Sequence, residues 1–227
     1  MSPTPAGLAR APDRAPDAAN RVTDPDRTLG RNWRTSADRA VTTSSDGTGL
    51  HLLVADAGAA YRWRTVATLL EPGFPTDQWI GQYCLTGSGR RAVVVYAPRE
   101  FSNHDELMSG GAFAAVVDLR TGAVHKLPDR VSLAYHNPGC SAGETATLSR
   151  RDTRADGTAE TWIGVVDTRR GVRTTTVRTP GQVTSVVPYQ GALAERQRPH
   201  AGAPGHRGPY EGSGRDRRSA APPARRR

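Results

Sequence analysis

An internal repeat constrains the fold of this chain more than any other feature. The stretch "AAVVDLRTGAVHKL" begins at Ala114, and "IGVVDTRRGVRTTTV" begins at Ile163. Each copy is an apolar run that ends in an Asp, with a Gly four residues later. Asp118 and Asp167 lie 49 residues apart. A period of roughly 40–50 residues is typical of propeller blades and other repeated supersecondary units.

The sequence around the repeat predicts strands rather than helices. Short apolar and β-branched runs alternate with Gly, Asp and Asn turns every 8–12 residues or so, which is typical of all-β folds. Asp46-Gly47 indicates one hairpin. Asp56, in "LLVADAGAAY", is a third and more decayed copy of the repeat. We therefore expect an all-β fold, a partial β-propeller of about three blades.

A family resemblance agrees with this expectation. "CLTGSGRRAVVVYAP" followed by "AAVVDLRTGAVHKL" resembles a blade of TolB-like and WD40-like β-propellers, and the resemblance covers about 41–189. Such blades carry a Ser-Pro-Asp-Gly phrase, a strand and an Asp-x-x-Thr-Gly turn. Here "TGSG" replaces the Pro-Asp-Gly, and the Trp-Asp dipeptide of WD40 blades is missing. The stretch also resembles the N-terminal part of large secreted actinobacterial proteins. The resemblance implies a fold and no catalytic residues.

Composition divides the chain into three parts. Residues 1–32 are rich in Pro, Ala, Asp and Arg, which predicts a disordered leader. Residues 33–189 hold most of the apolar runs and form the incomplete propeller-like domain. Residues 190–227 are rich in Arg, Pro and Gly, which predicts a disordered tail. Out-of-frame reading of GC-rich DNA produces such a composition, so we expect a truncated or frameshifted gene product.

The charge distribution argues against a nucleic-acid-binding domain. The tail carries nine arginines against three acidic residues, which is +6 of the formal net charge of +9 and leaves +3 for the rest. A basic tail would bind nucleic acid with salt-dependent, sequence-blind affinity. This one has a single aromatic residue and no RGG repeat, so we do not favour that partner. No apolar run reaches 18 residues, so we expect no membrane span, and no signal peptide is recognisable.

The two cysteines suggest a covalent link between repeats. Cys84 and Cys140 occupy matching places in consecutive repeats, each just before a small-residue turn. Because equivalent inner strands of neighbouring blades lie side by side, the pair is predicted to form a disulfide. The alternative is two unrelated buried thiols. A disulfide would indicate an oxidising compartment, and hence an extracellular parent protein.

The repeated Asp and Gly residues have two interpretations. Asp118, Gly122, Asp167 and Gly171 could belong to metal or phosphate sites. An Asp at the end of a strand more commonly accepts hydrogen bonds from the backbone of the following turn. We therefore predict that these four residues are structural turn residues.

Other candidate motifs are incomplete. "DTRADGTAE" has Arg154 and Ile163 where a calcium-binding EF-hand loop needs oxygen ligands. His104, Asp105 and Glu106 are adjacent in sequence, and adjacent residues rarely point at one ion. "TGSGRR" matches neither a phosphate-binding P-loop nor the turn that carries a nucleophilic serine. We assign no catalytic, cofactor-binding or metal-binding residues and expect no cofactor.

Taken as a whole, the sequence favours a non-catalytic scaffold or binding module. We expect it to be a truncated fragment of a larger extracellular protein, with a protein or a carbohydrate as ligand. Two alternatives stay open. One is the remnant of a propeller hydrolase, and the other is nucleic-acid binding through the basic tail.

Overall fold

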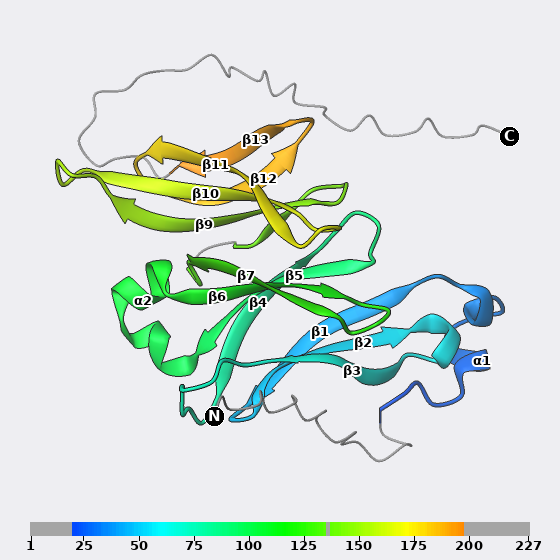
Figure 1. Cartoon of the computed structure of the whole chain (residues 1–227). Coiled ribbons are helices and arrows are strands. Elements are labelled where there is room, and N and C mark those ends of the chain that lie inside the picture. The colour runs from blue at the N-terminus through cyan, green and yellow to red at the C-terminus, as the bar shows by residue number, and fades with distance from the viewer. Residues whose placement is uncertain (1–19, 135–136, 198–227) are drawn as a thin grey trace, which may run out of the picture.

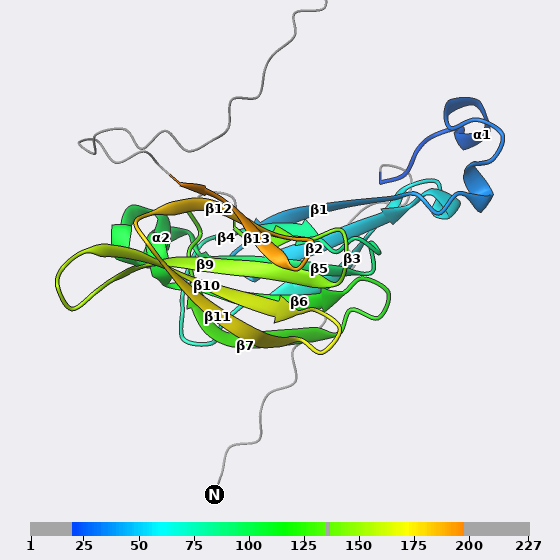
Figure 2. The same cartoon turned by 90° about the horizontal axis from the view of Figure 1, so that it is seen from above.

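Four antiparallel sheets follow one another in chain order, as Figures 1 and 2 show. A computed structural model describes residues 20–134 and 137–197, with the side chains of 195–197 left out. Within these ranges the sheets form an open stack rather than a closed ring. The prediction of an all-β, partial propeller fold is confirmed. No helix in the described ranges is long and apolar enough to cross a lipid bilayer.

The first sheet, blade 1, has three strands in the order β1-β2-β3. They are β1 (Arg39–Asp46), β2 (Gly49–Asp56) and β3 (Arg62–Leu69), accompanied by α1 (Pro25–Thr28), η1 (Trp33–Thr35) and η2 (Ala57–Ala59). The predicted hairpin is present, because the Oδ1 atom of Asp46 accepts a hydrogen bond from the backbone N–H of Thr48 at 2.7 Å. Asp56 ends β2 just as Asp118 and Asp167 end the third strands of the later sheets. Among the described residues, blade 1 therefore has no counterpart of their innermost strand.

The leader is more ordered than its composition predicted. The start of the described leader contacts blade 1, where the backbone N–H of Val22 donates to the carbonyl oxygen of Ala60 at 2.9 Å. The backbone N–H of Trp63 donates to the carbonyl oxygen of Asn20 at 3.1 Å. These bonds need backbone groups only, so a polar, Pro-rich composition does not prevent them. Residues 20–32 of the predicted leader are described in the structure, and residues 1–19 lie outside the described residues.

The second sheet, blade 2, has four strands in the order β4-β5-β6-β7. They are β4 (Trp79–Leu85), β5 (Arg91–Pro98), β6 (Ala112–Asp118) and β7 (Val124–Val131), with η3 (Arg99–Asn103) and α2 (Asp105–Gly110) between β5 and β6. β5 and β6 lie in the middle of the sheet and are buried on both faces. This burial explains why their sequences are continuous apolar runs rather than alternating ones.

The third sheet, blade 3, repeats this arrangement in the order β11-β10-β9-β8. Its strands are β8 (Gly139–Cys140), β9 (Thr145–Thr153), β10 (Ala159–Asp167) and β11 (Val172–Pro180). Equivalent pairs can be found in the two blades, although β10 and β6 have their bulges at different places. Ala114 pairs with Leu127 in blade 2, and Ile163 pairs with Val177 in blade 3. Ala114 and Ile163 each lie four residues before the Asp that ends the strand, so the two pairs occupy equivalent places.

A two-stranded sheet follows blade 3 and corrects the predicted end of the folded region. It consists of β12 (Val183–Tyr189) and β13 (Ala192–Gln197). The turn residues Gln190 and Gly191 have φ angles of 48° and 78°, the pattern of a tight hairpin turn. The β structure thus continues to Gln197, past the boundary predicted at 189. Composition missed the turn because Gln is uncommon where Asn or Asp usually precedes the Gly. Residues 198–227, and with them most of the predicted tail, lie outside the described residues.

The hydrophobic core is divided unequally. One large cluster joins blades 1, 2 and 3 and includes Trp79, Tyr96, Leu148 and Trp162. A second and much smaller cluster lies between blade 3 and the β12–β13 hairpin. Its members are Ile163, Val183 and Val186, with Leu193 packed against them.

Candidate functional site

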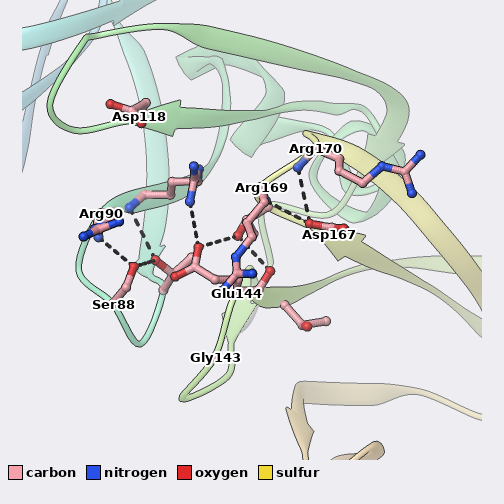
Figure 3. A network of polar contacts seen from close by, with 12 residues as sticks. Ser88, Arg90, Asp118, Gly143, Glu144, Asp167, Arg169 and Arg170 are labelled. Carbon is pink, nitrogen blue, oxygen red and sulfur yellow. Dashed lines mark hydrogen bonds and ion pairs between the residues drawn. The ribbon is translucent and has the colours of Figure 1, made fainter.

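The two cysteines and the repeated Asp and Gly residues lie near one end of blades 2 and 3. In a four-stranded antiparallel sheet, the first and the third turns leave at the same end. This end therefore collects the β4–β5, β6–β7, β8–β9 and β10–β11 turns, which Figure 3 shows from close by. We call it the turn end.

Asp118 and Asp167 face their own turns. The Oδ1 atom of Asp118 accepts from the backbone N–H groups of Arg120 at 3.0 Å and Thr121 at 2.8 Å. The Oδ1 atom of Asp167 accepts from the backbone N–H groups of Arg169 at 2.9 Å and Arg170 at 3.3 Å. The hydrogen bond from the Thr121 backbone is the main cause that lowers the pKa of Asp118 below its ordinary value.

The glycines of the two repeats complete these turns. Gly122 and Gly171 have φ angles of 76° and 64°, which a residue with a Cβ rarely adopts. Each Asp-Gly pair thus makes a turn by local backbone contacts, the geometry expected of a structural role. In the described part of the chain, no three His, Cys, Asp or Glu side chains are grouped so that they could hold a metal ion.

The two cysteines join the innermost strands of neighbouring blades. Cys84 lies on β4 and Cys140 on β8, and the structure links them in a disulfide with a Cα–Cα distance of 5.6 Å. This distance lies inside the range of about 4.4–6.8 Å that disulfides require. The bond holds the turn ends of blades 2 and 3 together.

A polar network next to the disulfide also connects these blades. The backbone N–H of Gly87 donates to the carbonyl oxygen of Gly143 at 2.9 Å. The guanidinium of Arg91 lies 2.9 Å from Oε2 of Glu144. The hydroxyl of Thr168 donates to the carbonyl oxygen of Glu144 at 2.8 Å. We call these five residues the interblade network.

Glu144 is the centre of the interblade network. Its side chain is only 12% exposed, and that of Arg91 is 22% exposed. Burial by itself would raise the pKa of Glu144, but hydrogen bonds from Ser88, Arg91 and Thr168 outweigh it and lower the pKa below the ordinary value of 4.5. Sequence analysis missed the network because Arg91 and Glu144 are 53 residues apart and belong to no motif.

An open groove lies between blade 3 and the β12–β13 hairpin. Its volume is about 640 Å³. One wall consists of the β8–β9 turn, a second of Val165, Thr175 and Val177, and a third of residues 188–193. None of the described residues that line this groove is charged. We call it the blade 3 groove. No sequence motif indicated it, because it depends on how the hairpin packs against blade 3.

Two other sequence candidates have structural explanations. In the loop that resembles an EF-hand, the Oδ1 atom of Asp156 accepts from the backbone N–H of Thr158 at 2.9 Å, as in a hairpin turn. Two tryptophans that could stack on a sugar ring if they were exposed are buried instead, since Trp79 is 1% and Trp162 is 4% exposed. These two rings pack inside the blades and are not available to a carbohydrate.

The fold and the site define an open, partial β-propeller with a disulfide between its blades. No protein-family model matches the chain, and no curated protein matches it. Among solved structures, it is similar to an acylaminoacyl peptidase from Pyrococcus horikoshii, with 11% identity and a TM-score of 0.41 over 68% of this chain. It is also similar to TolB from Acinetobacter baumannii, with 15% identity and a TM-score of 0.39 over 66% of this chain.

A third similar structure is a eukaryotic initiation factor, with 16% identity, a TM-score of 0.36 and 62% of this chain covered. The chain spans 25% of the peptidase, 33% of TolB and 30% of the initiation factor. Similarities of this size say nothing about function.

Proposed function

We propose that this chain is a non-catalytic binding module that holds an uncharged, apolar segment of a partner protein in the blade 3 groove. The observation that carries the proposal is the chemistry of the groove. Its described lining residues are uncharged, although the chain has a formal net charge of +9 and 23% charged residues. Ligand sites are typically concave and largely apolar, with a few polar groups that set orientation.

Two exposed apolar side chains support this use of the groove. Val177 is 37% and Tyr189 is 62% exposed, and both line it. A partner segment that covers them removes apolar surface from water, which stabilises the complex.

We further propose that the module belongs to a larger extracellular propeller protein. Blades 2 and 3 have four strands each, whereas blade 1 has three and the last sheet has two in the described ranges. Additional strands would complete both of these sheets. The disulfide favours an oxidising compartment, because such bonds persist mainly outside the cytosol.

The test is a selection of peptides from a displayed random library on the intact, oxidised protein. We expect the selected peptides to share an uncharged apolar core. Their binding should be lost in Val177→Arg, which places a charge in the groove. Val172→Arg is the matched control, because Val172 lies on the same strand, is 39% exposed and is not part of the groove. Selected peptides that bind Val177→Arg as well as the unmodified protein would overturn the proposal.

A further inference from the structure

We propose that the segment in the blade 3 groove is bound as a β-strand, which pairs with the free edge of β13. It would take the place that the third strand occupies in blades 2 and 3. This inference rests on the proposed function and specifies the conformation of the ligand. Three comparisons within the molecule support it.

The first comparison concerns the order of strands. In blade 2 the second strand, β5, pairs with β4 on one edge and with β6 on the other. In blade 3, β9 pairs with β8 and β10 in the same way. β12 and β13 are the equivalents of the first two strands. The hydroxyl of Thr147 on β9 donates to the carbonyl oxygen of Val186 at 2.6 Å, which places β12 against the inner part of blade 3.

It follows that β13 is the equivalent of β5 and β9. Within the described residues it pairs with β12 only, so its other edge has no strand partner. Such an edge presents unpaired backbone N–H and C=O groups, and a partner strand can bind them by extending the sheet.

The second comparison concerns exposure at equivalent places. Leu127 in blade 2 is 8% exposed, whereas Val177, which occupies the equivalent pair in blade 3, is 37% exposed. Val116 is 1% exposed, whereas its repeat equivalent Val165 is only half-buried and lines the groove. Blade 2 is covered on this face by blade 3, which has four strands. Blade 3 is covered on the equivalent face by the β12–β13 hairpin, which has only two.

The third comparison concerns the chemistry of the third strands. β6 is buried from Ala112 to Val117, and β10 is buried from Glu160 over most of its length. Because β6 has no charged residue before its final Asp118, its sequence matches an uncharged groove. The molecule thus contains an example of the strand that it would bind, an apolar run of about seven residues that ends at an Asp turn.

The experiment uses the intact, oxidised protein and a fluorescent synthetic peptide with the sequence of residues 109–122. A scrambled peptide is the first control. Two further peptides carry backbone N-methyl groups, one at Ala114 and Val116 and the other at Ala115 and Val117. N–H groups of alternate residues point to opposite edges of a strand, so only one of these sets would face β13.

We expect one N-methylated peptide to bind at least about tenfold more weakly, because it loses two backbone hydrogen bonds of about 1 kcal/mol each. The other should bind within about twofold of the unmodified peptide, which shows that N-methylation alone is harmless. The unmodified peptide should also lose its binding in Val177→Arg and keep it in Val172→Arg.

The outcomes separate this inference from the proposed function. If Val177→Arg blocks the unmodified peptide but both N-methylated peptides bind alike, the groove binds peptides without strand pairing, and only this inference fails. It also fails alone if this peptide does not bind while library-selected apolar peptides do. If no peptide distinguishes Val177→Arg from Val172→Arg, the proposed function and this inference fail together.

Discussion

Blade 3 has an interface with blade 2 on one face and an interface with the β12–β13 hairpin on the other. The two interfaces differ in the bonds and the apolar contacts that hold them together. The first has a disulfide, the interblade network and a share of the large core. The second has a small cluster around Ile163 and, beside it, the open blade 3 groove. A completed interface adds stability, whereas an incomplete one leaves apolar surface for a ligand.

The largest expected effect is the loss of the disulfide from the completed interface. In the chain-entropy model, opening a loop of this length costs about 4 kcal/mol of folding stability. We therefore expect Cys84→Ala combined with Cys140→Ala to unfold at a clearly lower denaturant concentration than the oxidised protein. A reducing agent should destabilise the unmodified protein and leave the double variant unchanged. Two titratable thiols in denatured, unreduced protein from an oxidising host would contradict the bond itself.

The next largest effect concerns the close approach of two turns in the same interface. A Cβ added at Gly87 would meet the backbone carbonyl of Ala142. Because a backbone group cannot give way as a flexible side chain can, Gly87→Ala should cost about 3 kcal/mol, as measured by denaturant unfolding. Gly143→Ala is the matched control, since its Cβ would meet only Oγ of Ser141, at 3.5 Å. Equal stability of the two variants would mean that the turns are not packed against each other.

The third prediction uses pH to test the interblade network. The pKa of Glu144 is lowered in the folded protein, so its contribution to stability is present above its ordinary value of 4.5 and is lost as the pH falls through the folded value. Glu144→Gln should therefore cost about 2 kcal/mol at neutral pH, where a charged hydrogen-bond acceptor is lost. The cost should shrink as the solution is acidified. A cost that is independent of pH would indicate that the charge of Glu144 contributes nothing.

The smallest expected effect on folding stability comes from the repeated Asp turns, which lie beside the interface between blades 2 and 3. Asp118→Ala removes the acceptor of two backbone hydrogen bonds and should cost about 1 kcal/mol. Asp118→Asn keeps an acceptor oxygen and should cost less. The same two changes at Asp167, in blade 3, should behave alike, because this residue also accepts two backbone hydrogen bonds. Loss of a bound metal ion on substitution would instead support the interpretation of these residues as metal ligands.

Local sequence signals located much of the fold. The strands of blades 2 and 3 and the hairpin at Asp46 follow from patterns among neighbouring residues. The paired repeat also led to Cys84 and Cys140, because equivalent places in adjacent blades come together whatever the intervening residues are. The strand β13 was missed, since its turn has an uncommon Gln190. The contacts of Asn20 and Val22 with blade 1 are backbone hydrogen bonds, which no side-chain pattern indicates.

The sequence by itself determined the strands of blades 2 and 3, their turns and the repeat that orders them, because these depend on side-chain periodicity and on turn residues close together in the chain. Only the tertiary structure decided that Arg91 meets Glu144, and that Leu127 is buried while its equivalent Val177 is exposed. The physical reason is that burial at a repeated position depends on how many strands the next sheet contributes. Two residues in equivalent strand pairs can therefore differ in solvent exposure, and the more exposed one, Val177, lines the groove.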